Sequence, residues 1–447
     1  MPQLPPEILL SIFPRAIPPH ALLDTALARG NSSAWCQTLR SIKSILLVSR
    51  LWYNVAVSFL YQNICIRRFY QLDFLRATLC GTSSAHLASL VKSIAIECHV
   101  PEGNDILFID HLQAILPRCS SLSTFAYEYV FKIPSCTLPV VVPVHITHLR
   151  LDDNGLKFFD IVNHLESFLL SFHLTLRQPN FETKNHNLSS LQSLSVQLTH
   201  ANSKFQVLNT IRAHWTMPSL QRFTLAIYCF SPPINYYNVE PDILGFLVRF
   251  GGHLQQLHIC VGESIFRPES FKLLLSACPQ LQRIILHPST LYRHFWSDSD
   301  LADFFHPSLR HIDFTHLLSQ LDTYDTSNLC LSKEHLPALE SVRRFCNFPH
   351  DMCRWLDDYP PSPDPDAETF VINIFHHQLD CVAGLYVWRF EPNVLMDIDG
   401  GALSGSFTVW IDSDDDDDYV LSDDLESESD SSSEQGDEEW PTDDGDI

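Results

Sequence analysis

The sequence has few basic residues, and they form no cluster. Its 447 residues include 29 Lys and Arg against 53 Asp and Glu, a formal net charge of −24. Residues 412–447 alone hold 18 acidic and no basic residues, so the rest of the chain carries only −6. A nucleic-acid-binding protein is expected to present a basic face or stripe. We therefore expect no nucleic acid among its partners.

Long apolar runs and paired cysteines are also missing. No apolar run approaches the ~18 residues that predict a transmembrane helix, and no basic segment precedes the first apolar residues. The 13 cysteines are scattered and form no C-x-x-C pair, which favours reduced, buried thiols over a disulfide framework. These absences predict a protein of the cytoplasm or nucleus that neither spans nor binds a membrane.

The motifs of common catalytic sites are absent as well. The sequence contains no G-x-G-x-x-G, G-x-x-x-x-G-K-[ST], H-E-x-x-H or G-x-S-x-G pattern. The group closest to a metal site, Cys346, His350 and Cys353 with His376 and His377 farther along, has no second pair of cysteines. We therefore expect no enzyme activity, no cofactor and no metal.

What the sequence does contain begins with a short amphipathic helix in "LPPEILLSIF", residues 4–13. Prolines suit the first turn of a helix, and Ile8, Leu9, Ile12 and Phe13 fall on one apolar stripe. Pro14 should end or kink this helix within about three turns. A helix this short needs a partner to be stable.

Two further helices are predicted downstream as that partner. Apolar residues at helical spacing mark residues 39–48, and Ser49 can cap a following helix through "RLWYNVAVSFLYQ". The three segments together predict a small helical cluster.

The order of these segments resembles an F-box, in particular the version found in many fungal F-box proteins. The similarity lies in "LPPEILLSIF" followed by "LLVSRLW". It implies a few helices whose exposed apolar side docks on the Skp adaptor of a cullin-based (SCF) ubiquitin ligase. The adaptor-facing residues that it implies are Leu4, Pro5, Ile8, Leu9, Ile12, Leu47, Val48 and Trp52.

This chain departs from the compact pattern through an insertion at about 14–38. Such an insertion costs little, because the entropy of loop closure grows only logarithmically with length. A simpler alternative is that the same apolar residues form the N-terminal cap of the following domain. Both readings predict the same helices.

A pattern of the form L-x-x-L-x-L recurs through the middle of the chain. It begins at residues 91, 122, 146, 191, 220, 254, 281 and 309, with a partial unit at 339 and a degenerate unit suggested at 165–170. Each unit predicts a strand followed by a helical stretch, and stacked units share one core. The region resembles a divergent leucine-rich-repeat solenoid, an α/β fold with a parallel sheet.

Alternate strand residues should face the concave side of that sheet. Several are Arg or His, which would suit an acidic or phosphorylated target, although solubility alone also requires polar residues there. The candidate target-binding residues are Arg150, Arg222, His258, Arg283 and His311.

The predicted organisation has five parts: a helical F-box-like domain at 1–80, the solenoid at 81–358, a proline-rich linker at 359–368, a β-rich cap at 369–411 and a disordered acidic tail at 412–447. The function that the resemblance implies is a non-catalytic substrate receptor of the ubiquitin conjugation pathway, which brings an unknown target protein to the ligase. The alternative is a repeat-based interaction scaffold without a role in ubiquitylation.

Overall fold

The fold is taken from a computed structural model. The residues that the structure describes are 5–16, 34–82, 85–98, 100–101, 103–127, 142–153, 158–176, 184–198, 206–227, 239–261, 266, 268–286, 305–315, 335–345, 375–382 and 385–392. The expected linker, the acidic tail and Cys346, His350 and Cys353 lie outside these ranges.

Three helices form the N-terminal part of the described chain: α1 (Pro6–Ala16), α2 (Ala34–Leu46) and α3 (Arg50–Gln62). All three were expected from the apolar spacing. α1 includes Pro14 and ends two residues later, after 11 residues, which confirms its predicted length of about three turns.

A single sheet of 13 strands dominates the described residues. Its order is β1-β2-β3-β4-β5-β7-β9-β10-β11-β12-β13-β15-β14, and every pairing is parallel except the last, between β14 and β15. The parallel strands up to β13 are β1 (Asn63–Ile66), β2 (Ser93–Ile96), β3 (Thr124–Tyr127), β4 (His148–Asp153), β5 (Ser171–Leu176), β7 (Ser193–Leu198), β9 (Arg222–Ile227), β10 (Gln256–Val261), β11 (Arg283–Leu286), β12 (His311–Thr315) and β13 (Ser341–Phe345).

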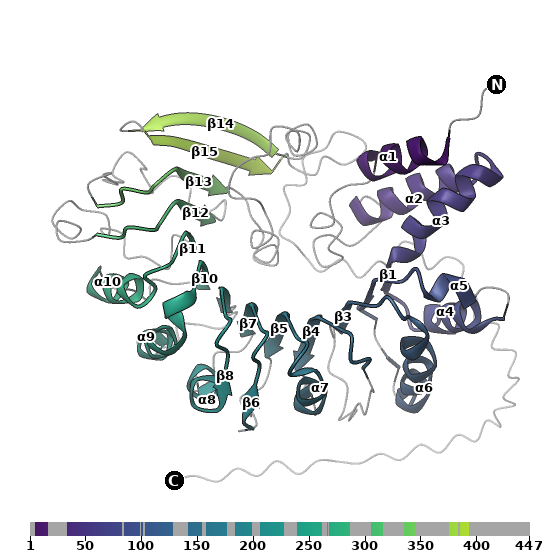
Figure 1. The fold of residues 1–447 in the computed structure, drawn as a ribbon, viewed down its shortest axis with the longest axis horizontal. Coiled ribbons are helices and arrows are strands. Elements are labelled where there is room, and N and C mark those ends of the chain that lie inside the picture. Colours follow the sequence, from purple (N-terminus) through teal and green to yellow (C-terminus); the bar gives the residue numbers. More distant parts are fainter. Residues whose placement is uncertain are drawn as a thin grey trace, which may run out of the picture. The chain divides into compact units, whose positions relative to one another are not determined.

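Helices connect many of these strands and lie on one face of the sheet (Figure 1). They are α4 (Gln71–Cys80), α5 (Ala85–Ala88), α6 (Asp105–Ile115), α7 (Phe158–Leu165), α8 (Gln206–His214), α9 (Val239–Phe250) and α10 (Pro268–Ala277), with short 3-10 turns at Leu116–Arg118 and Gly251–His253. We call this the helix face, and the other the opposite face. Strand residues such as Leu194, Phe223 and Leu257 are fully buried on the helix face and belong to one continuous core.

The first leucine of each unit lies in a turn just before the strand. In most units the backbone N–H of this residue donates to the carbonyl three residues earlier, as in Leu220 to Met217 and Leu281 to Cys278. The next two N–H groups donate to one carbonyl of the preceding unit, for example Gln192 and Ser193 to Leu170. This hydrogen bonding explains why one sequence pattern gives one strand per repeat.

The structure corrects two details of the expected repeats. The degenerate unit begins at Leu169 rather than at 165, because the strand it leads into is β5. The sheet also starts earlier than expected: β1 follows α3 directly and pairs with β2, so the first strand lies before residue 80.

The described C-terminal strands, β14 (Phe375–Val382) and β15 (Leu385–Pro392), form an antiparallel hairpin, and β15 pairs with β13. Both strands fall within the β-rich segment expected at 369–411. A small second sheet, β6 (His186–Asn187) with β8 (Trp215–Thr216), lies beside the main one. Among the described residues, no helix combines the length and apolarity needed to cross a bilayer.

Candidate functional site

The three N-terminal helices are held together by a small apolar core of their own. Leu9 and Phe13 of α1 are buried against Ala56 of α3. The Phe13 ring lies 5.3 Å from the ring of Trp52 and 6.3 Å from that of Phe59, measured between ring centres. This core uses only one edge of the apolar stripe on α1.

The other edge of that stripe is open to solvent. Ile8 and Ile12 are each 45% exposed, and Leu10 on the far side of the helix is 49% exposed. Burial of Leu9 and Phe13 therefore leaves three large aliphatic side chains of α1 uncovered.

The turn between α2 and α3 exposes two more apolar side chains. The N–H groups of Leu47 and Val48 donate to the carbonyls of Ser44 and Ile45, and the Ser49 hydroxyl accepts from the Trp52 N–H at 3.2 Å to cap α3. The predicted cap is thus confirmed. This hydrogen-bonded turn holds Leu47 at 87% exposure and Val48 at 59%.

We define the N-terminal apolar surface by its exposed members: Ile8, Leu10, Ile12, Leu47, Val48 and Tyr53. Four of these, Ile8, Ile12, Leu47 and Val48, were expected to face an adaptor. Leu10 and Tyr53 were not among the expected residues, and their exposure could not be predicted, because a helical period identifies a stripe but not which neighbouring helix covers each edge.

The remaining expected adaptor residues have different positions. Pro5 is exposed, and Trp52 is half-buried beside Phe13. Leu9 differs from the expectation: its side chain is 0% exposed because it holds α1 against α3. Leu4 lies outside the described residues.

The five expected target-binding residues all lie on β-strands, at positions between the core-facing ones. Arg222 is exposed and Arg150 is half-buried. His258, Arg283 and His311 are buried, with exposed fractions of 0%, 4% and 8%. The opposite face is thus accessible along part of the sheet and buried at β10 to β12.

A buried ion pair joins two of the strands in that buried part. Arg283 Nε lies 2.7 Å from Asp313 Oδ2, and the two side chains are 5% and 0% exposed. Next to it, His311 Nδ1 lies 2.9 Å from the Ser341 hydroxyl. These contacts tie β11, β12 and β13 together within the chain.

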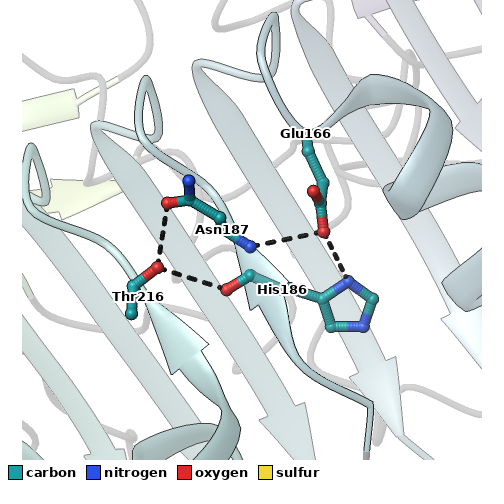
Figure 2. A network of polar contacts seen from close by, with 4 residues as sticks. All are labelled: Glu166, His186, Asn187 and Thr216. Carbon is teal, nitrogen blue, oxygen red and sulfur yellow. Dashed lines mark hydrogen bonds and ion pairs between the residues drawn. The ribbon is translucent and has the colours of Figure 1, made fainter.

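On the small sheet, a polar network links three successive repeats (Figure 2). Glu166 Oε1 lies 3.1 Å from His186 Nδ1 and accepts the N–H of Asn187 at 3.3 Å. The Thr216 hydroxyl lies 3.4 Å from the His186 carbonyl oxygen and 2.9 Å from Asn187 Oδ1. Sequence patterns gave no signal for this network, since its members are far apart along the chain.

The network stabilises the contact between neighbouring repeats. The buried His186 ring packs edge-on against Trp215, with 5.4 Å between ring centres. Burial lowers the pKa of His186, while its hydrogen bond to Glu166 opposes that shift. Burial thus favours the neutral imidazole. The contact between Glu166 and His186 fixes the orientation of the ring and connects β6 to the end of α7.

The buried thiols are poor nucleophiles. Burial raises the pKa of Cys98 and of Cys278 to about 12, and that of Cys119 to about 11. The thiolate is the reactive form of cysteine, so these three groups stay protonated. Within the described ranges, no cluster of three or more His, Cys, Asp or Glu could hold a metal ion.

Comparison with known proteins adds little. No protein-family model and no curated protein matches the chain. Among solved structures, the leucine-rich-repeat-containing protein LegL7 from Legionella pneumophila is similar with a TM-score of 0.40 and 12% identity, covering 67% of this chain and all of that one. The repeat architecture described above rests on the strands and hydrogen bonds of this chain itself.

Proposed function

We propose that this protein is a substrate receptor that docks on a Skp-type adaptor through its N-terminal helices and presents a target protein bound to its repeats. The observation that carries this proposal is the N-terminal apolar surface. Large apolar side chains exposed close together along the chain commonly mark interaction sites. Two members on α1 and two in the α2–α3 turn coincide with the residues that the F-box resemblance assigned to adaptor contact.

A partner that covers these side chains gains binding free energy. Burying one large aliphatic side chain is worth about 1.5–3 kcal/mol. Ile8, Ile12 and Leu47 could therefore supply several kcal/mol when covered. Leu9 contributes indirectly, since it fixes the helix that presents Ile8 and Ile12.

The target is assigned to the accessible part of the opposite face. The exposed His148 and Arg222 are the first residues of β4 and β9, which lie at the same level of the sheet with β5 and β7 between them, and Arg150 lies two residues further along β4. Polar, partly cationic side chains on rigid strands suit an acidic or phosphorylated protein segment. His258, Arg283 and His311 then support the sheet rather than contact the target.

The chain would act by proximity and make no covalent bond. Holding a target beside the ubiquitin-transfer machinery raises the effective concentration of its lysines. The cullin and the conjugating enzyme, supplied by other subunits, would perform the chemistry.

The proposal is tested by affinity purification of the full chain, with identification of stoichiometric partners. We expect an adaptor and a cullin, and we expect both to be lost when Ile8, Ile12 and Leu47 are changed to Ala together. Val248 and Leu273, on α9 and α10, are 76% and 60% exposed. Their change to Ala is the matched control and should leave both partners bound.

Each result separates the candidate functions. Recovery of the adaptor without any cullin would favour the interaction scaffold over the ligase receptor. Recovery of neither, or equal recovery with the triple variant, would contradict adaptor docking by this surface.

A further inference from the structure

The N-terminal apolar surface is bordered by positive charge on a chain that is otherwise acidic. Residues 34–72 contain five Arg and Lys and no Asp or Glu, whereas the whole sequence has a net charge of −24. α1 adds one exposed carboxylate, Glu7, in its first turn. The five cations lie on α2, on α3 and directly after β1.

Three of these cations border Leu47 directly. Arg40 and Lys43 precede it by seven and four residues, so α2 places them on the same side as the turn. Arg50 follows it at the first position of α3. All three side chains are exposed.

Three of the five cations, Arg40, Arg67 and Arg68, have partners within the chain. Arg67 Nε lies 3.9 Å from the buried Glu97 Oε2, and Arg68 donates to the Tyr70 hydroxyl at 3.4 Å. By contrast, Lys43 and Arg50 form no ion pair with the described part of the chain. The charge available to a partner is therefore concentrated at the α2–α3 turn.

We propose that the partner of this surface is a protein with an acidic rim around an apolar groove, and that Lys43 and Arg50 steer it into place. The inference rests on the proposed function and adds the charge of the adaptor face that docks here. Leu47 and Val48 enter the groove, and the cations meet carboxylates at its edge. Rim charges act mainly on the association rate and on its dependence on salt, while the buried apolar groups set the dissociation rate.

The same cations give the surface selectivity. Residues 412–447 carry a charge of −18 out of the net −24 of the chain, so an acidic partner is repelled by the chain as a whole and attracted at the α2–α3 turn. Like-charge repulsion away from the contact and attraction at the contact together orient the encounter.

The test measures association and dissociation rates of the full chain with a purified Skp-type adaptor, between about 0.05 and about 0.5 M NaCl, where the screening length falls to a few ångströms. The double variant Lys43→Glu, Arg50→Glu should associate about tenfold more slowly at low salt, with little change in dissociation rate. Wild-type association should slow towards the variant's rate as salt rises. The neutral variant Lys43→Gln, Arg50→Gln should be intermediate.

A remote pair of cations supplies the control. Lys272 on α10 and Arg310 before β12 are changed to Glu in the same chain, and this variant should keep the wild-type rates. Melting temperatures of all variants establish that they are folded.

The outcomes distinguish the inference from the proposed function. If the adaptor binds and its association rate is independent of salt and of the Lys43 and Arg50 changes, the acidic partner face is wrong and adaptor docking stands. If the adaptor does not bind the wild-type chain at any salt concentration, both are wrong.

Discussion

At the scale of single residues, the side chain of His306 accepts a hydrogen bond that a backbone carbonyl accepts in other repeats. In the other described repeats, the N–H of the first apolar residue donates to a backbone carbonyl three residues earlier, or four residues earlier at Leu169, but Leu309 N–H donates to His306 Nδ1 at 3.1 Å. His306 Nε2 lies 3.0 Å from the Cys278 carbonyl of the preceding repeat. Both contacts are satisfied only by the neutral ring with its proton on Nε2.

This arrangement predicts a loss of stability in mild acid. Burial lowers the pKa of His306, so the unfolded chain, with a pKa near 6.5, binds a proton more readily than the folded one. The free energy of unfolding should therefore fall as the pH drops below about 6.5, by at most about 1.4 kcal/mol per pH unit for this group.

Melting temperatures between pH 8 and pH 5 check this prediction. The variant His306→Gln should be less stable at pH 8 and should depend less on pH than wild type. Changing the exposed His253 to Gln is the control. An unchanged pH profile in His306→Gln would show that His306 does not contribute to it.

The buried Arg283–Asp313 pair supports a second prediction at this scale. Removing one partner of a buried ion pair leaves the other charge uncompensated and costs about 3–5 kcal/mol. Asp313→Ala should lower the free energy of unfolding by about that amount, as measured by denaturant titration. The exposed pair Arg310–Glu340, at 3.3 Å, is the control: Glu340→Ala should cost about 0–1 kcal/mol.

At the scale of elements, the sequence pattern located the strands well, and it failed where the required information is non-local. All three leucines of L-x-x-L-x-L are buried, the first in the turn and the other two on the strand, so most strand positions could be predicted. β1 was missed because α3 leads into it without such a turn. β5 was expected too early because Leu165 and Leu169 are both buried and equally plausible starts.

Burial on the two faces of an element could not be predicted in the same way. The stripe on α1 was recognised, but its division into a buried edge and an open edge depends on where α3 packs. The burial of His258 and Arg283 depends equally on the fold rather than on local spacing. The candidate site was therefore predicted as a region, and only partly as a set of side chains.

The division of α1 leads to a prediction about adjacent leucines. Leu9 is 0% exposed and Leu10 is 49% exposed. Leu9→Ala removes a core contact worth about 2–5 kcal/mol and should detach α1, seen as faster hydrogen exchange and proteolysis at 6–16. Leu10→Ala should leave α1 docked; equal proteolysis of the two variants would contradict this packing.

At the scale of the whole described fold, stability is shared between neighbouring repeats. Phe246 lies on α9, the helix between β9 and β10. Its ring stacks on that of Phe223 of β9, with 4.2 Å between ring centres, and also contacts Phe250. In a repeat array, each unit is stabilised mainly by the units beside it. A substitution that destabilises one repeat should therefore unfold that repeat and its neighbours before the rest of the sheet.

Phe246→Ala tests this locality, since it should cost about 3–5 kcal/mol. Native-state hydrogen exchange should show lost protection at β9 and β10, with protection at β2 and β3 retained. Loss of protection to the same extent in all four strands would indicate instead that the sheet unfolds as a single unit.

The direct passage from α3 into β1 has a mechanical consequence. α3 ends at Gln62 and β1 begins at Asn63, and the Gln62 carbonyl accepts the Lys92 N–H at 2.9 Å. Because no linker separates them, α3 is rigidly connected to β1. A protein bound to the strands would therefore keep a fixed orientation relative to a protein bound to the helices. Inserting a few glycines after Gln62 would make that relative orientation variable.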